Sequence, residues 1–106
     1  MSEIEGRYIH QSFSIDHYAI VKLQIYRMDM EEVVFENHCT FEQLPKKFAV
    51  GVEMAVQDYL SEHNIADIQV CLLDGNWHEY DSSERDFYIA ILLALFEIFS
   101  PKNKTN

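Results

Sequence analysis

The residues best suited to chemistry lie in one stretch, DGNWHEYDSSE, residues 74–84. Aspartate, histidine and serine occur together here, and these are the residue types of a hydrolytic triad. A triad needs three side chains that converge from separate elements, with an oxyanion hole beside the nucleophile. Ser82 and Ser83 instead fall where a helix begins, and hydroxyls at that position usually cap the helix. The stretch also lacks a GxSxG elbow, so the sequence predicts no catalytic residue and no enzyme.

Metal and nucleotide sites are not indicated by the spacing of the remaining polar residues. The candidate metal ligands are five histidines and two cysteines, at His10, His17, His38, His63, His78, Cys39 and Cys71. No pair of them has HxxxH or CxxC spacing, and neighbours such as His38 and Cys39 point to opposite faces of a strand. The sequence therefore predicts no metal and no cofactor, and it favours two reduced thiols over the alternative of one disulfide. It contains no GxxxxGK[ST] motif, which predicts that no nucleotide binds.

Length and charge exclude further classes of function. The chain has 106 residues, is 48% hydrophobic and carries a net charge of −10, which fits one globular domain. A protein that coats nucleic-acid phosphates needs clustered Lys and Arg, so this charge argues against that mode. The first residues have neither a basic n-region nor an apolar h-region, so we expect no secretory signal. The longest apolar run, Tyr88 to Phe99, is interrupted by Glu97 and is shorter than the roughly 20 residues that cross a bilayer. We therefore expect no membrane association and a cytoplasmic protein.

Hydrophobic periodicity predicts the elements that must position these residues. Period-two and period-3.6 patterns indicate strands over about 8–13, 17–28, 33–41 and 67–73, and helices over about 45–63 and 82–99. A turn at 29–32 predicts that the second and third of these strands form a hairpin. The order β-β-(β)-α-β-α, with the 8–13 strand as the optional one, implies an α+β two-layer sandwich. The single domain, 1–106, has its core at about 8–99, with tails at 1–6 and 100–106.

The last predicted helix is apolar on nearly every side. One stripe contains Tyr88, Ile91, Leu92, Leu95 and Phe99, and a second contains Phe87, Ala90, Ala94 and Ile98. One stripe should face the sheet, which leaves the other to be covered. A homodimer through helix 82–99 would cover it. The alternative is that the N-terminal segment around Ile4 and Tyr8 covers it.

The loop before this helix separates the two most hydrophobic segments of the chain. Asp81 and Glu84 have the spacing of a capping box, which would fix the start of the helix. The preceding reversal at Asp74–Gly75 would then project Asn76, Trp77 and His78 beyond the end of the sheet. Exposed aromatic and histidine side chains on a loop held by rigid elements commonly bind a partner. The alternative is that Trp77 folds back as a lid on the core.

A longer stretch is specific enough to indicate a family. Residues 67–97, DIQVCLLDGNWHEYDSSERDFYIAILLALFE, resemble the signature of domain IV of translation elongation factor G and of the tetracycline-resistance ribosomal protection proteins. The pattern DGxxHExDSSE carries most of the resemblance. Upstream, LPKKFAVGVEMAV and QSFSIDHYAIV are similar to two further segments of that family. The resemblance extends from about Gln11 to Glu97.

This resemblance implies both a fold and a function. The fold would be related to a domain of a small-subunit ribosomal protein, with an unusual left-handed β-α-β crossover. The function would be contact with the small ribosomal subunit through two tip loops. The resemblance places the binding residues in those loops, at Ser14, Asp16, His17, Asn76, Trp77, His78 and Glu79.

The sequence also departs from the family. The glycine-rich tip loop is replaced by Phe13-Ser14-Ile15-Asp16-His17, which removes the positive-φ conformations that glycines allow. The alternative function is therefore a soluble interaction or regulatory domain that kept the fold and lost ribosome binding.

Overall fold

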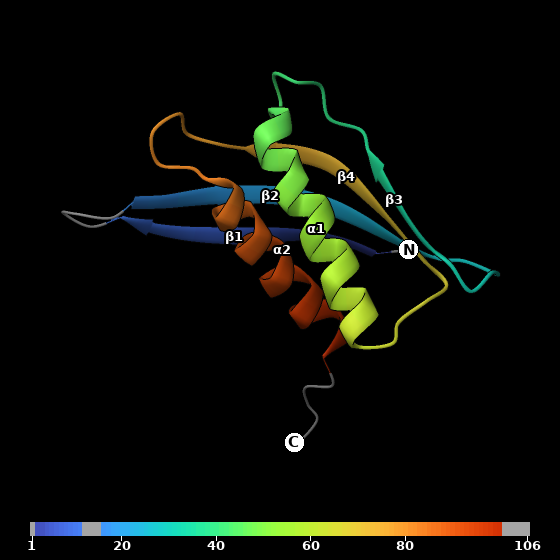
Figure 1. Cartoon of the computed structure of the whole chain (residues 1–106). Coiled ribbons are helices and arrows are strands. Elements are labelled where there is room, and N and C mark those ends of the chain that lie inside the picture. The colour runs from blue at the N-terminus through green and yellow to red at the C-terminus, as the bar shows by residue number, and fades with distance from the viewer. Residues whose placement is uncertain (1, 12–15, 101–106) are drawn as a thin grey trace.

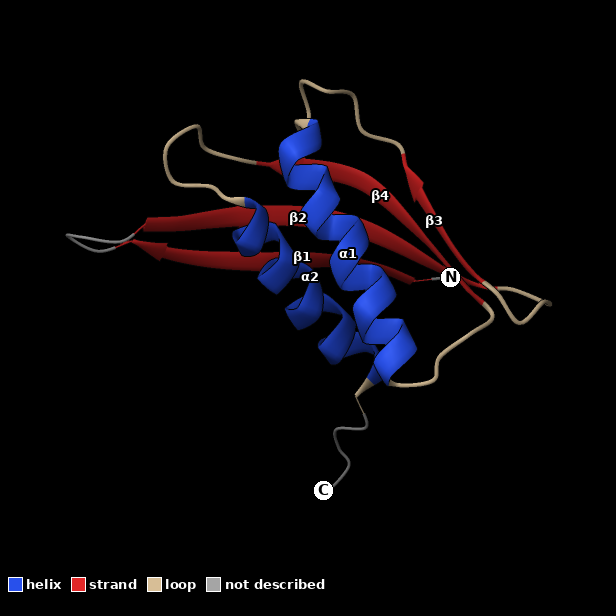
Figure 2. Ribbon diagram, viewed as in Figure 1, coloured by secondary structure: helices blue, strands red, loops and turns tan. Residues whose placement is uncertain are grey.

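The computed structural model describes residues 2–11 and 16–100 and contains four strands and two helices (Figure 1). They follow in the order β1 (Ser2–Gln11), β2 (Asp16–Arg27), β3 (Val33–Asn37), α1 (Lys46–Glu62), β4 (Ile68–Asn76) and α2 (Glu84–Phe99). Both helices lie on the same face of a single sheet (Figure 2). The predicted α+β two-layer sandwich is confirmed, and the optional strand of the prediction is present as β1.

The strand pairing differs from the predicted hairpin. The sheet order is β1-β2-β4-β3, so β2 pairs antiparallel with β1 and with β4. β3 does not pair with β2 and instead runs parallel to β4. The hairpin prediction was wrong because hydrophobic alternation identifies a strand but not its partner. The turn at 29–32 moves the chain one strand further, to the edge of the sheet.

The connection from β3 through α1 to β4 has the rarer hand. β3 and β4 point the same way in Figure 1, α1 lies in front of the sheet, and β3 lies at the edge of the sheet. With these strands drawn upright, the chain steps from right to left as it crosses the front, which makes a left-handed crossover. Nearly all β-α-β connections are right-handed. The left-handed crossover implied by the family resemblance is therefore present.

The N-terminal residues are part of the sheet. Residues 2–6, expected to be a tail, form the first half of β1, with Ser2 opposite Ile25. Gly6 in the middle of β1 lies directly under α2, close to Ala90 and Ala94. Ile4 and Tyr8 of the same strand pack against the core from its edge. β1 thus covers α2, which was the alternative to a dimer.

Both apolar stripes of α2 are packed within the domain. Phe87, Ala90, Ile91, Ala94 and Leu95 are buried, and they come from both predicted stripes. They are covered by α1, β1 and β2. The homodimer prediction assumed one uncovered stripe, and that assumption was wrong. Self-association through α2 would have to use its exposed apolar residues, Leu93 and Phe96.

The start of α2 is also two residues later than expected. Ser83 is the N-cap, and its hydroxyl accepts the backbone N–H of Asp86 at 3.1 Å. The predicted capping box of Asp81 and Glu84 is therefore not formed. A serine in extended conformation before the first turn caps as well as an aspartate, which leaves the Asp81 side chain for another contact.

Within the described residues, no helix is long and apolar enough to cross a membrane.

Candidate functional site at the tip of the domain

Two segments distant in sequence meet at one end of the sheet. One consists of the paired ends of β1 and β2, near Gln11 and Asp16–Tyr18, and the other is the loop 77–83 between β4 and α2 (Figure 1). We call these residues the tip. The pairing of β2 with β4 brings the two segments together, since Ile20 lies opposite Asn76.

Side-chain hydrogen bonds join the two segments of the tip. The Ser82 hydroxyl accepts the His78 backbone N–H at 2.8 Å and donates to the Tyr18 carbonyl. Gln11 Nε2 donates to Asp81 Oδ2 at 3.3 Å. These bonds fix the loop on the strand ends, so Ser82 and Asp81 of the motif support the loop.

A buried carboxylate fixes the start of α2 to the start of β2. Asp86 is only 1% exposed, and its Oδ1 lies 2.7 Å from His17 Nδ1. Its second oxygen accepts the Tyr18 backbone N–H at 3.4 Å. A carboxylate is buried at little net cost only when such partners satisfy it. His17, predicted as a binding residue, therefore has a structural contact as well.

We expect Asp86→Ala to lower the free energy of unfolding by about 1–3 kcal/mol, because His17 and a backbone N–H lose their acceptor. The change also removes a negative charge from the first turn of α2, where it interacts favourably with the helix dipole. Urea unfolding followed by circular dichroism measures this. Asp29→Ala, in the exposed turn after β2, is the matched control and should change stability by less than about 0.5 kcal/mol. Equal effects of the two substitutions would contradict the structural role of Asp86.

Trp77 does not project from the tip. Its ring lies against Phe48 of α1, with 5.7 Å between ring centroids, and it is half-buried on the hydrophobic core. Its indole N–H donates to the Glu42 carbonyl at 3.4 Å. The lid arrangement, considered as the alternative from sequence, is the observed one. The burial of a large aromatic surface at the end of the core accounts for it.

The reversal at Asp74–Gly75 is also not a turn. β4 continues through both residues to Asn76, and no described glycine has positive φ. A Cβ at Gly75 would lie 3.0 Å from a Leu44 methyl group. Glycine leaves room here for Leu44, which packs over the strand, and the chain turns only after Asn76.

Four of the other predicted binding residues are exposed. His78, Glu79 and Asp16 are exposed at the tip, and Asn76 is exposed at the end of β4 beside it. His78 Nδ1 lies 3.5 Å from Asp81 Oδ2. Ser14 lies outside the described residues.

Sequence reasoning missed two exposed aromatic residues at this end. Tyr80 in the tip loop is 85% exposed. Phe41 is 76% exposed and neighbours Glu42, whose carbonyl accepts the Trp77 indole. Tyr and Phe are enriched in protein interfaces relative to the rest of the surface, so both rings are candidates for contact with a partner. Tyr80 and Phe41 both lie in polar segments without hydrophobic periodicity, and this could have identified them from sequence as exposed.

The tip offers little positive charge for its size. Asp16, Glu79 and Asp81 lie in its two segments, and the exposed lysines Lys46 and Lys47 lie beside it at the start of α1. Lys47 is also turned toward the Phe48 ring, with its Nζ 5.1 Å from the ring centroid. The tip is therefore suited to stacking and hydrogen bonding more than to neutralising phosphates.

Comparisons with known proteins agree with this geometry. Residues 1–101 match the family model described as elongation factor G, domain IV. An elongation factor G-like protein of Synechocystis sp. is 35% identical over 101 residues, and elongation factor G of Mycoplasma genitalium is 33% identical over the same length. Each alignment covers 91% of this chain and 15% of the relative, so the chain spans a small fraction of these proteins.

A solved structure shows the same fold. A crystal structure of a Thermus thermophilus protein superimposes with a TM-score of 0.77 at 24% identity, covering 92% of this chain and 16% of the other. In this family the domain is a non-catalytic part of a translation factor, whose GTPase activity lies in other domains. From its sequence match and its fold together, this chain belongs to the elongation factor G domain IV family.

Proposed function

We propose that this chain is a non-catalytic binding module that contacts the small ribosomal subunit through its tip. Membership of a family of translation factor domains supports this proposal. The observation that carries it is the bracing of the tip, where Gln11, Tyr18 and His17 are bonded to the loop 77–83 and to α2. The chain would act in the cytoplasm, without nucleotide.

A braced loop suits recognition because little conformational entropy remains to be lost on binding. The bonds of Ser82 and Asp81 fix the backbone on both sides of Glu79 and Tyr80. His78 and Tyr80 then present rings that can stack on an unpaired base or hydrogen-bond to a protein surface. Trp77 supports the loop from behind through Phe48.

The charge of the chain determines how the affinity of the proposed contact should depend on salt. The net charge is −10 and the tip is not basic, so few counterions would be released on binding. The affinity should therefore depend weakly on salt, unlike that of a protein that neutralises many phosphates.

We expect His78→Ala/Tyr80→Ala to reduce co-sedimentation with purified small subunits at least tenfold, because the two largest exposed rings of the loop are lost. Pelleting at two salt concentrations measures the affinity and its salt dependence. Phe96→Ala is the matched control, since it removes an exposed ring, 59% exposed, from the C-terminal half of α2. Both variants should keep the circular dichroism spectrum of the parent chain.

The same experiment separates the second candidate, a protein-interaction domain that has lost the ribosome. That candidate is favoured by the acidic tip and by exposed Phe41, a surface suited to a basic or apolar partner. No co-sedimentation of the parent chain at either salt concentration would support it. Equal loss in both variants would show binding that does not use the tip.

A further inference from the structure

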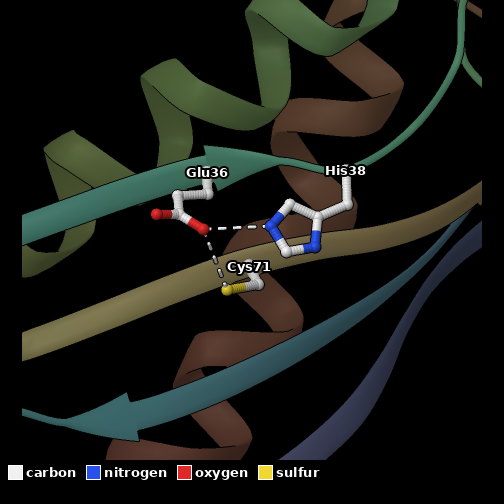
Figure 3. A group of neighbouring side chains, drawn as sticks. All are labelled: Glu36, His38 and Cys71. Carbon is white, nitrogen blue, oxygen red and sulfur yellow. Dashed lines mark hydrogen bonds and ion pairs between the residues drawn. The ribbon is translucent and has the colours of Figure 1, made fainter.

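Three potential metal ligands converge on the face of the sheet that the helices leave open, away from the tip. Glu36 of β3 and Cys71 of β4 are register partners in the parallel pair. His38 follows two residues after Glu36, so the period of two places it on the same face. Its backbone N–H donates to the Leu72 carbonyl at 2.9 Å, which continues the ladder beyond β3 and holds His38 beside Cys71. Figure 3 shows the three side chains pointing toward one another.

The distances are close to those of a coordination site. His38 Nε2 lies 3.0 Å from Glu36 Oε1, and Cys71 Sγ lies 4.0 Å from the same oxygen. All the potential ligand atoms lie within 4.8 Å of one another. Tetrahedral zinc, with bonds of about 2.0–2.3 Å, holds its ligand atoms about 3.3–3.6 Å apart. Small side-chain rotations of Glu36 and His38, both exposed at the surface, would provide that spacing without moving either strand.

The three residues also differ in burial in a way that suits a bound ion. Cys71 is only 3% exposed and lies at the floor of the cluster, while Glu36 and His38 stand on the solvent side. Burial, and then the Glu36 carboxylate, raise the pKa of the Cys71 thiol. The other cysteine, Cys39, packs against the core, and burial followed by Asp74 raises its pKa to about 11.

We propose that Glu36, His38 and Cys71 form a binding site for one zinc-like divalent cation. Thiolate and imidazole ligands select Zn²⁺ or a similar transition-metal ion over Mg²⁺ and Ca²⁺, which prefer oxygen. The carboxylate supplies the third bond and offsets the charge of the ion. A solvent molecule takes the fourth position, since the cluster faces outward. The ion links β3 to β4 and so strengthens the edge strand of the sheet.

Cobalt provides a direct test, because a cysteine thiolate bound to Co²⁺ gives an intense charge-transfer absorption that oxygen and nitrogen ligands do not. We expect the untagged, reduced chain to bind one Co²⁺ with this absorption, and Zn²⁺ to displace it. Cys71→Ser should abolish the absorption. His38→Ala, at an exposed position that the fold does not need, should weaken Zn²⁺ binding in calorimetry at least tenfold. Mg²⁺ should not compete at equal concentration.

Matched controls come from the other cysteine and from an exposed histidine on another strand. Cys39→Ser and His10→Ala should bind both ions as the parent chain does. Loss of the absorption in Cys39→Ser with retention in Cys71→Ser would overturn the proposal. It would also be overturned by absence of the absorption in the parent chain, or by Zn²⁺ affinity unchanged in His38→Ala. None of these results depends on ribosome binding, so the outcome is separate from that of the proposed function.

Discussion

Replacing Phe87 with alanine should lower the free energy of unfolding by about 3–5 kcal/mol, the range for removing a buried aromatic side chain. Phe87 has the largest side chain among the fully buried residues that the structure describes. Its ring stacks on Phe48 of α1, with 5.2 Å between centroids. The cavity left by Phe87→Ala would lie between two helices and the sheet, whose other contacts prevent it from collapsing.

The control lies on the same helix. Phe96→Ala removes an identical side chain from a position that is 59% exposed, so its effect should stay within about 0.5 kcal/mol. Urea unfolding of both variants measures the difference. Trp77, the single tryptophan of the chain, also packs on Phe48, so its fluorescence should report a loosened tip in Phe87→Ala only. Similar unfolding midpoints for the two variants would contradict the assigned core.

Element type could be predicted from local pattern because burial on one face leaves a period in the sequence. Val21, Leu23 and Ile25 alternate with more exposed residues and do form the inward face of β2. Phe48, Val52 and Val56 recur at helical spacing and are the buried side of α1. In each case the contacts that fix the element lie along its own length.

Strand pairing could not be predicted in the same way. β3 has only five residues, and its pattern fits either an antiparallel hairpin with β2 or a parallel edge beside β4. Short connections usually join sheet neighbours, and right-handed crossovers are strongly preferred. Both rules pointed away from the observed arrangement. Only the family resemblance, which is a comparison and not a physical derivation, indicated the left-handed crossover.

The same limit explains the errors at the candidate sites. Sequence reasoning grouped Trp77 with His78 because they are adjacent, but Phe48, 29 positions upstream, packs on Trp77 and turns it inward. The metal ligands were missed because only spacings within one segment were tested. Glu36 and His38 are on β3 and just beyond its end, Cys71 is on β4, and only the parallel register brings them together. A Glu-x-His pattern on a strand was the available signal.

Gly6→Ala is expected to destabilise the domain by about 1–3 kcal/mol, the usual cost of forcing an atom into a packed core. A Cβ at Gly6 would lie 2.5 Å from the Ala90 carbonyl oxygen and 3.0 Å from the Ala94 methyl group. The carbonyl belongs to the backbone of α2, so it cannot rotate away as a side chain can. β1 would have to separate from α2, and the cover that β1 gives to this apolar helix would be weakened.

Gly75→Ala tests whether the loss of stability depends on the kind of atom that the new Cβ meets, backbone or side chain. A Cβ at Gly75 would lie 3.0–3.2 Å from three side-chain atoms of Leu44, which can shift slightly. No described glycine has positive φ, so the alanine backbone is unstrained at both sites and the reduced entropy of the unfolded chain offsets part of the clash. We therefore expect Gly6→Ala to have the lower midpoint in urea unfolding. It should also show more 1-anilinonaphthalene-8-sulfonate fluorescence, as apolar surface of α2 becomes exposed. A Gly6→Ala variant as stable as Gly75→Ala would mean that β1 does not pack tightly on α2.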